Sequence, residues 1–265
     1  MNIKTIGTLA LLALTSAIVS CDNIDEDERF VQRTFTAERN VLVEEFTGQM
    51  CVNCPNGHQV LSAIQNLTQH HAIVVGIHAG NLALSESVAP GIGLANDEGA
   101  IYDSRYGVEA YPSAVINRKT APISDTNAWQ GLVAGFLETP ATAELTPVAT
   151  LSEDGKSINV SCAVLPQTAI DGKLQLWLTE SGITNMQLVP TVGYDMNYVH
   201  NHVFRAAING IDGQEVNLVA DEMQSFSTDI AVKDDWNTDN LSVVAFIYNS
   251  KDGVIQVEET KVVKE

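Results

Sequence analysis

The stretch VLVEEFTGQMCVNCP, residues 41–55, decides how the first half of the chain folds. Residues 41–46 are mostly β-branched or aromatic and end at a Thr-Gly pair, a pattern typical of a strand. Past Pro55, four apolar residues recur at helical spacing on one side: Val60, Leu61, Ile64 and Leu67. The sequence therefore predicts a Cys-x-x-Cys pair at a strand-to-helix junction.

That position has consequences for cysteine chemistry. Unpaired N–H groups and the helix dipole stabilise an anion at a helix N-terminus, so Cys51 should be the attacking thiolate. Cys54, one turn on, could then resolve the mixed disulfide. Two alternatives stay open: a structural disulfide, which an exported protein would keep oxidised, and a soft metal site completed by His58 or His78.

Further elements follow the cysteine pair. Residues 72–77 read as a buried strand and residues 97–105 as a short helix. Pro112 opens the strand at 113–117, and we expect its peptide bond to be cis. Asp125 is positioned to cap a last helix.

This order of elements resembles the thioredoxin fold. Glu45 and Phe46 stand six and five residues before Cys51, where thioredoxins carry a buried acid followed by Phe. The resemblance implies a nucleophilic Cys51 and a resolving Cys54. It also implies that Glu45 assists proton transfer at Cys54, and that Pro112 shapes a substrate groove. The Val-Asn dipeptide between the cysteines departs from the usual ones, which leaves the redox direction open.

Helical periodicity disappears after a Pro-rich linker near residue 140. Short alternating segments take over, at 145–151, 157–164, 173–180, 198–207, 241–249 and 254–262. Turn residues separate them, which predicts an antiparallel β-sandwich of immunoglobulin-like size. Cys162 should be a buried apolar side chain. His200 and His202 should share a strand face, as a structural pair rather than a metal chelate.

The N-terminal end predicts export and lipidation. Residues 1–20 combine Lys4 with an apolar core and small residues, as a signal peptide does. The following Ile-Val-Ser-Cys resembles a bacterial lipobox, which implies cleavage before Cys21 and acyl chains on its sulfur. Such chains would anchor the protein to a membrane. Residues 22–28 are strongly acidic and read as a tether, or as a signal for display on the outer surface.

Composition narrows the function classes. The 265 residues carry 14 Lys+Arg against 33 Asp+Glu, a net charge of −19. This acidity argues against nucleic acid as a partner. An apolar content of 45% argues against a disordered chain. We expect an α+β chain with a signal peptide at 1–20 and a tether at 21–29. A thioredoxin-like α/β domain at 30–140 and a β-sandwich at 141–265 would follow.

Three segments also resemble the Omp28 family of Bacteroidetes-type outer-membrane lipoproteins. They are residues 41–55 and the C-terminal strings LQLWLTESGI (174–183) and YVHNHVFR (198–205). The resemblance implies an outer-membrane location. We expect a lipid-anchored thiol–disulfide oxidoreductase that needs no cofactor and acts on protein thiols or disulfides. The alternative is a non-enzymatic surface binding protein, an adhesin or receptor subunit, with a structural disulfide.

Overall fold

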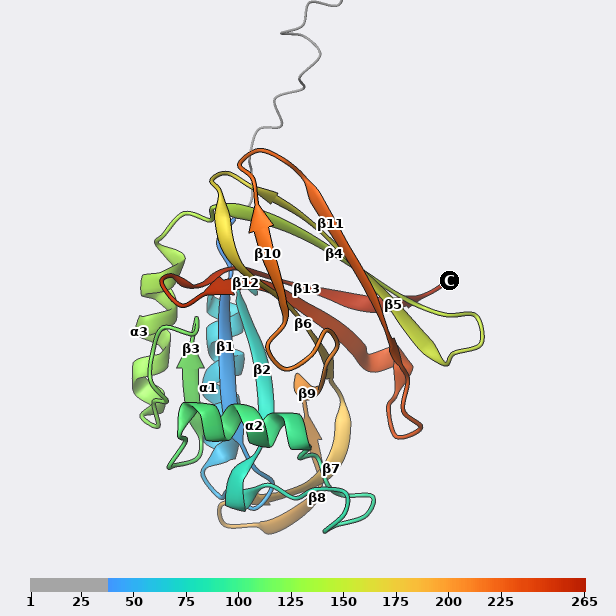
Figure 1. The fold of residues 1–265 in the computed structure, drawn as a ribbon. Coiled ribbons are helices and arrows are strands. Elements are labelled where there is room, and N and C mark those ends of the chain that lie inside the picture. The colour runs from blue at the N-terminus through green and yellow to red at the C-terminus, as the bar shows by residue number, and fades with distance from the viewer. Residues whose placement is uncertain (1–37) are drawn as a thin grey trace, which may run out of the picture. The chain divides into compact units, whose positions relative to one another are not determined.

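The elements predicted around the cysteine pair are present in the computed structural model, which describes residues 38–265 (Figure 1). Cys21 and the flanking signal peptide and tether lie outside these residues. The first half consists of β1 (Val41–Thr47), α1 (Cys54–Leu67), β2 (Ala72–His78), α2 (Asp97–Tyr106), β3 (Ser113–Ile116) and α3 (Thr126–Leu137). None of these helices is long and apolar enough to span a bilayer.

Strand β1 is buried along its whole length because both of its faces are covered. It pairs in parallel with β2 and antiparallel with β3. Val41 and Val43 face α1 and α3, while Leu42 and Phe46 join a second core on the α2 side. The Asp125 side chain accepts the Asn127 N–H and so caps α3, as predicted.

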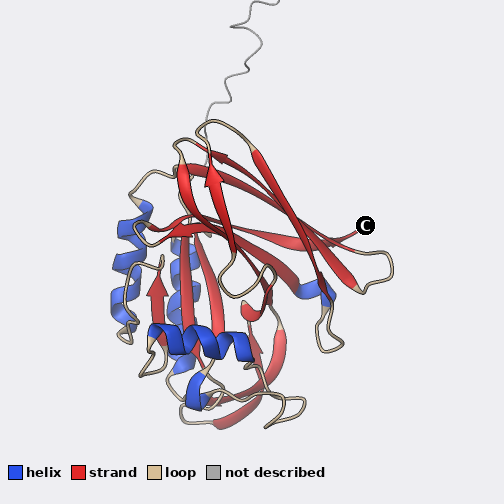
Figure 2. Ribbon diagram, in the orientation of Figure 1, coloured by secondary structure: helices blue, strands red, loops and turns tan. Residues whose placement is uncertain are grey.

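The second half is almost entirely strands (Figure 2). They are β4 (Ala143–Leu151), β5 (Ser157–Pro166), β6 (Ile170–Glu180), β7 (Ile183–Val189), β8 (Gly193–His200), β9 (Val203–Ala207), β10 (Gln214–Leu218), β11 (Gln224–Ala231), β12 (Leu241–Asn249) and β13 (Gly253–Lys264). The prediction of one strand over residues 198–207 is wrong. His202 has a positive φ of 56° and separates β8 from β9, so His200 and His202 do not share a strand face.

The expected fold class, a thioredoxin-like domain followed by an immunoglobulin-like sandwich, is also wrong. Eleven strands from both halves join one mixed sheet, in the order β11-β5-β4-β13-β12-β6-β9-β2-β1-β3 with β10 beside β6. Parallel pairing of β2 with β9, at Gly76 and Val203, joins the halves. Alternation along a strand reports which face is buried but not which strand it pairs with, so the sequence could not reveal this junction. The boundary drawn at residue 140 stays a prediction.

The side chains of strand β6 pack into two different hydrophobic cores, one on each face of the sheet. Leu174, Leu176 and Leu178 pack with β4, β5 and β12 in the larger core. Trp177 points the other way, to Phe204 of β9 and Phe246 of β12, with ring centroids 5.2 and 4.9 Å away. Both faces of β6 are therefore buried, as expected for a strand inside a sheet rather than one with a wet face.

The described chain begins by binding β13. Arg39 donates to the carbonyl oxygens of Val254 and Ile255. The Asn40 amide donates to the Val257 carbonyl at 3.0 Å, and the Gln256 amide donates back to the Glu38 carbonyl at 2.7 Å. We call residues 38–40 and their partners on β13 the entry clasp. It ties the first described residues to a strand of the other half.

Candidate functional site

The two cysteines form a disulfide, as one of the predicted alternatives requires. Cys54 is the first residue of α1 and Asn53 is its N-cap. Cys51 is 2% exposed and Cys54 is fully buried. The pair thus occupies the predicted helix start, but both residues lie beneath other parts of the chain.

The β7–β8 hairpin covers the cysteine loop. The Gln187 amide donates to the carbonyl oxygens of Cys51 and Gly48, at 3.0 and 3.3 Å. The Leu188 N–H donates to the Gln49 carbonyl at 2.7 Å. Gln187 is fully buried, so these contacts replace water over the loop. Attack on a disulfide needs access to a sulfur, and this cover restricts it.

Glu45 and Pro112 meet at Gly57, in the first turn of α1. A Cβ on Gly57 would lie 2.9 Å from Glu45 Oε1 and 3.0 Å from a Pro112 ring carbon. The Tyr111–Pro112 peptide bond is cis, as predicted. Glu45 is buried, and burial raises its carboxyl pKa well above the usual value. The roles implied for Glu45 and Pro112 in proton transfer and substrate binding stay predictions.

A cluster of histidines lies beside Glu45. His58 Nε2 is 3.6 Å from Glu45 Oε1, and His58 Nδ1 is 2.7 Å from the Tyr198 hydroxyl. Ring centroids of His78 and His200 are 5.2 Å apart. Burial lowers the pKa of His58 and of His200 to about 4, and lowers that of His78 well below its ordinary value. Within residues 38–265, no three His, Cys, Asp or Glu side chains are arranged to hold a metal ion.

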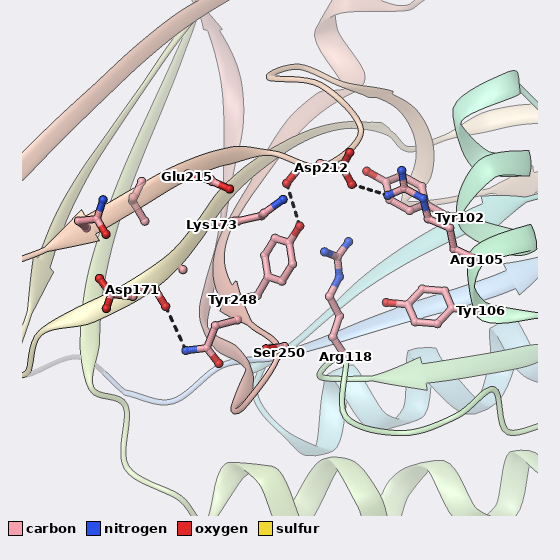
Figure 3. A pocket seen from close by; sticks show the side chains of 14 residues that line it. Tyr102, Arg105, Tyr106, Arg118, Asp171, Lys173, Asp212, Glu215, Tyr248 and Ser250 are labelled. Atoms are coloured by element: carbon pink, nitrogen blue, oxygen red, sulfur yellow. Dashed lines mark hydrogen bonds and ion pairs between the residues drawn. The ribbon is translucent and has the colours of Figure 1, made fainter.

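A larger cavity, of about 650 Å³, opens on the α2 side of the sheet (Figure 3). We call it the arginine pocket. This volume is within the range of small-molecule sites, roughly 300–1,000 Å³. Residues from both halves line it: Tyr102, Arg105, Tyr106, Arg118, Asp171, Gly172, Lys173, Asp212, Glu215, Val216, Asn217, Tyr248, Asn249 and Ser250. None of these residues was predicted as a site residue.

Arg118 lies between Tyr106 and Tyr248, and its guanidinium points into the pocket (Figure 3). Its side chain is only 10% exposed. The guanidinium carbon is 4.3 Å from the ring centroid of Tyr248, 4.7 Å from Phe246 and 5.2 Å from Trp177. Such aromatic contacts stabilise a cation and hold its plane in one orientation.

Glu44 holds the inner edge of the same guanidinium. The Arg118 Nε–H donates to Glu44 Oε1 at 3.2 Å. Nη2 is at ion-pair distance from the same oxygen but makes no hydrogen bond. Burial raises the pKa of Glu44, while Arg118 and the Tyr106 hydroxyl oppose the rise. Nη2 is buried on the Glu44 side, whereas Nη1 makes no hydrogen bond within the described residues and stays available to a bound molecule.

The turn after β3 places Arg118 in the pocket. Asn117 and Arg118 both have positive φ, 54° and 52°, which costs non-glycine residues about 1 kcal/mol each. The Asn117 amide donates to the Val254 carbonyl and the Val254 N–H donates back to the Asn117 carbonyl, each at 2.9 Å. Gly253 lies so close that a Cβ there would overlap the Asn117 carbonyl oxygen. Sequence reasoning had no signal for this turn, because its partner Val254 is 137 residues downstream.

The model of the family Outer membrane protein Omp28 matches residues 100–265, more than half of the chain. The chain belongs to the Omp28 family. Membership of this family of outer-membrane proteins agrees with the predicted outer-membrane location. The residues matched to Omp28 include the whole lining of the arginine pocket, whereas Cys51 and Cys54 lie outside the match.

Two solved structures share the fold at low sequence identity, and a third was compared over about half of the chain. HBP35 of Porphyromonas gingivalis is 16% identical, with a TM-score of 0.68 over 86% of this chain and 77% of that one. A protein from Agrobacterium tumefaciens is 13% identical, with a TM-score of 0.50 over 86% and 96%. A domain of the outer-membrane lipoprotein Omp28 from P. gingivalis is 25% identical over 47% and 91%, with a TM-score of 0.34. No protein of curated function matches the chain.

Proposed function

We propose that this Omp28-family lipoprotein is a non-enzymatic binding protein of the outer membrane, with its ligand in the arginine pocket and a structural Cys51–Cys54 disulfide. The observation that carries the proposal is the contrast between two places. The disulfide is buried beneath Gln187, whereas the pocket is open and holds Arg118, whose Nη1 makes no hydrogen bond within the described residues. Binding sites typically combine such a concave shape with a few convergent polar groups.

The second candidate is the thiol–disulfide oxidoreductase expected from the sequence. The meeting of Glu45 and Pro112 at Gly57, in the first turn of α1, favours it. The buried sulfurs oppose it, because a substrate thiolate must reach one of them along the S–S axis. Lipidation of Cys21 would hold the protein at the membrane under either candidate.

The reduction potential of the pair separates the two candidates. The full chain is equilibrated with a dithiothreitol series and its thiols are counted by alkylation mass shift, with Cys162→Ala removing the remaining buried thiol. We expect slow exchange and a potential below roughly −300 mV. Fast exchange between roughly −120 and −270 mV would contradict a structural role. Replacing both cysteines by Ser should lower stability by about 2 kcal/mol, since the bond closes a short loop, and should leave ligand binding intact.

A further inference from the structure

The arginine pocket presents one set of groups suited to an anion. The Arg118 guanidinium points into the cavity, and its Nη1 makes no hydrogen bond within the described residues. Lys173 of β6 extends into the same space, and makes no ion pair within residues 38–265. Arg105 is already engaged by Asp212, at 2.6 Å. A planar fork and a second cation are what a carboxylate needs for a charge-assisted pair.

The rest of the lining is suited to hydroxyl groups on a ring. Asp171 and Glu215 lie across the pocket from Arg118, are exposed, and make no ion pair within the described chain. Ionised carboxylates only accept hydrogen bonds, so they suit a ligand with O–H donors. Asn217, Asn249 and Ser250 add neutral polar groups.

The tyrosines contribute ring surface rather than hydroxyls. Tyr102 donates its hydroxyl to the Ile211 carbonyl, Tyr106 to Glu44, and Tyr248 to the Asp212 carbonyl, at 2.8, 3.0 and 2.9 Å. With these hydroxyls used inside the protein, what they offer to a ligand is mainly apolar area.

We infer that the arginine pocket binds an acidic sugar, with the sugar carboxylate on Arg118 and Lys173, the ring beside the tyrosines and the hydroxyls on Asp171 and Glu215. The inference rests on the proposed binding function and names its ligand class. A neutral sugar would leave the Arg118 donors unpaired. An aromatic acid would leave the acidic side of the pocket without donors.

Galacturonate and galactose form a matched pair of probes, because they differ only in the carboxylate at C6. The full chain, purified in detergent, is titrated with each by calorimetry, and with phenylacetate as the aromatic acid. We expect galacturonate to bind roughly tenfold or more tightly than galactose, as one charge-assisted pair provides. Equal binding of the two sugars, tighter binding of phenylacetate, or no binding of galacturonate would each overturn the inference.

Variants of the pocket lining test whether the sugar binds there. Arg118→Gln should abolish the preference for galacturonate, and Arg118→Lys should restore part of it. Because Arg118 is buried, two variants at the rim provide an independent test: Lys173→Met should weaken galacturonate severalfold, and Ser250→Trp should block both sugars by filling the cavity. Lys156→Met removes a lysine in the β4–β5 turn, far from the pocket lining in sequence and outside it, and should change nothing. Unchanged binding in both rim variants would overturn the inference.

The acidic-sugar inference and the proposed binding function can fail separately, because the sugar titrations test one and the reduction potential tests the other. If galacturonate does not bind and the disulfide exchanges slowly, the inference of an acidic sugar is wrong. The proposed binding function then stands, with another ligand. A readily exchanging disulfide would remove the proposed function whatever the sugars do.

Discussion

The histidine cluster gives the protein a stability that depends on pH. His58 and His200 have pKa values of about 4 in the folded chain, against 6.5 for an ordinary histidine. Their neutral forms are therefore favoured by folding. The stability they contribute is complete above pH 6.5 and is lost as pH falls towards 4. Glu45 acts with the opposite sign, because its raised pKa makes the folded state weaker as pH rises.

We expect His58 and His200 to destabilise the folded chain as pH falls below neutral. Each should cost about 2 kcal/mol of unfolding free energy between about pH 7 and pH 5. His200→Gln should remove the share that His200 carries, while His58 and His78 keep theirs. Urea unfolding at three pH values across this interval measures it, with exposed His70→Gln as the matched control. An unaltered pH profile in His200→Gln would show that the cluster does not carry the effect.

At the scale of elements, the β12–β13 turn holds Arg118 in place through Gly253. Gly253 has a φ of 71°, and its surroundings leave no room for a Cβ. Gly155 in the β4–β5 turn has nearly the same φ, 69°, but a Cβ there would have no other atom within 4 Å. The two glycines therefore separate backbone strain from steric contact.

Gly155→Ala should lower the unfolding free energy by about 1 kcal/mol, the cost of a left-handed alanine. Gly253→Ala should lower it by roughly twice that or more, because the Asn117–Arg118 turn must also move. Chemical denaturation of both variants gives the comparison. Gly253→Ala should in addition weaken galacturonate binding, whereas Gly155→Ala should not. Equal losses of stability would mean that the turn adjusts freely.

Part of this structure could be predicted from the sequence, and part of it could not. Alternation and capping residues predicted β1, α1, β2 and the long strands of the second half, because those signals are local. The partner of β2 could not be predicted, since pairing of Gly76 with Val203 depends on elements far apart in sequence. Cys51 bonds to Cys54, and Glu45 and Pro112 both approach Gly57, but the covering Gln187 left no pattern in the sequence. Arg118 was missed because its site is assembled from both halves.

At the scale of the whole molecule, the continuous sheet predicts a single unfolding transition for residues 38–265. Trp129 reports on the core between the sheet and the helices α1 and α3, and Trp236 on the larger core of the second half. In urea, the fluorescence of the Trp129→Phe variant and that of the Trp236→Phe variant should change at the same midpoint. Residues 141–265 alone should not fold stably, because Trp177 and Phe246 would lose Tyr102 and β2 as neighbours. Separate midpoints, or a cooperatively folded fragment, would contradict this.

The entry clasp determines where a mechanical load enters the protein. Within the described residues, a pull from the N-terminal side reaches Arg39 and Asn40 before it reaches β1. Their bonds lead to Val254 and Val257 of β13, a strand with neighbours on either side in the sheet. Tension is thus passed to the second half of the chain as well as to β1, and the sheet bears it as a unit instead of being peeled from one edge.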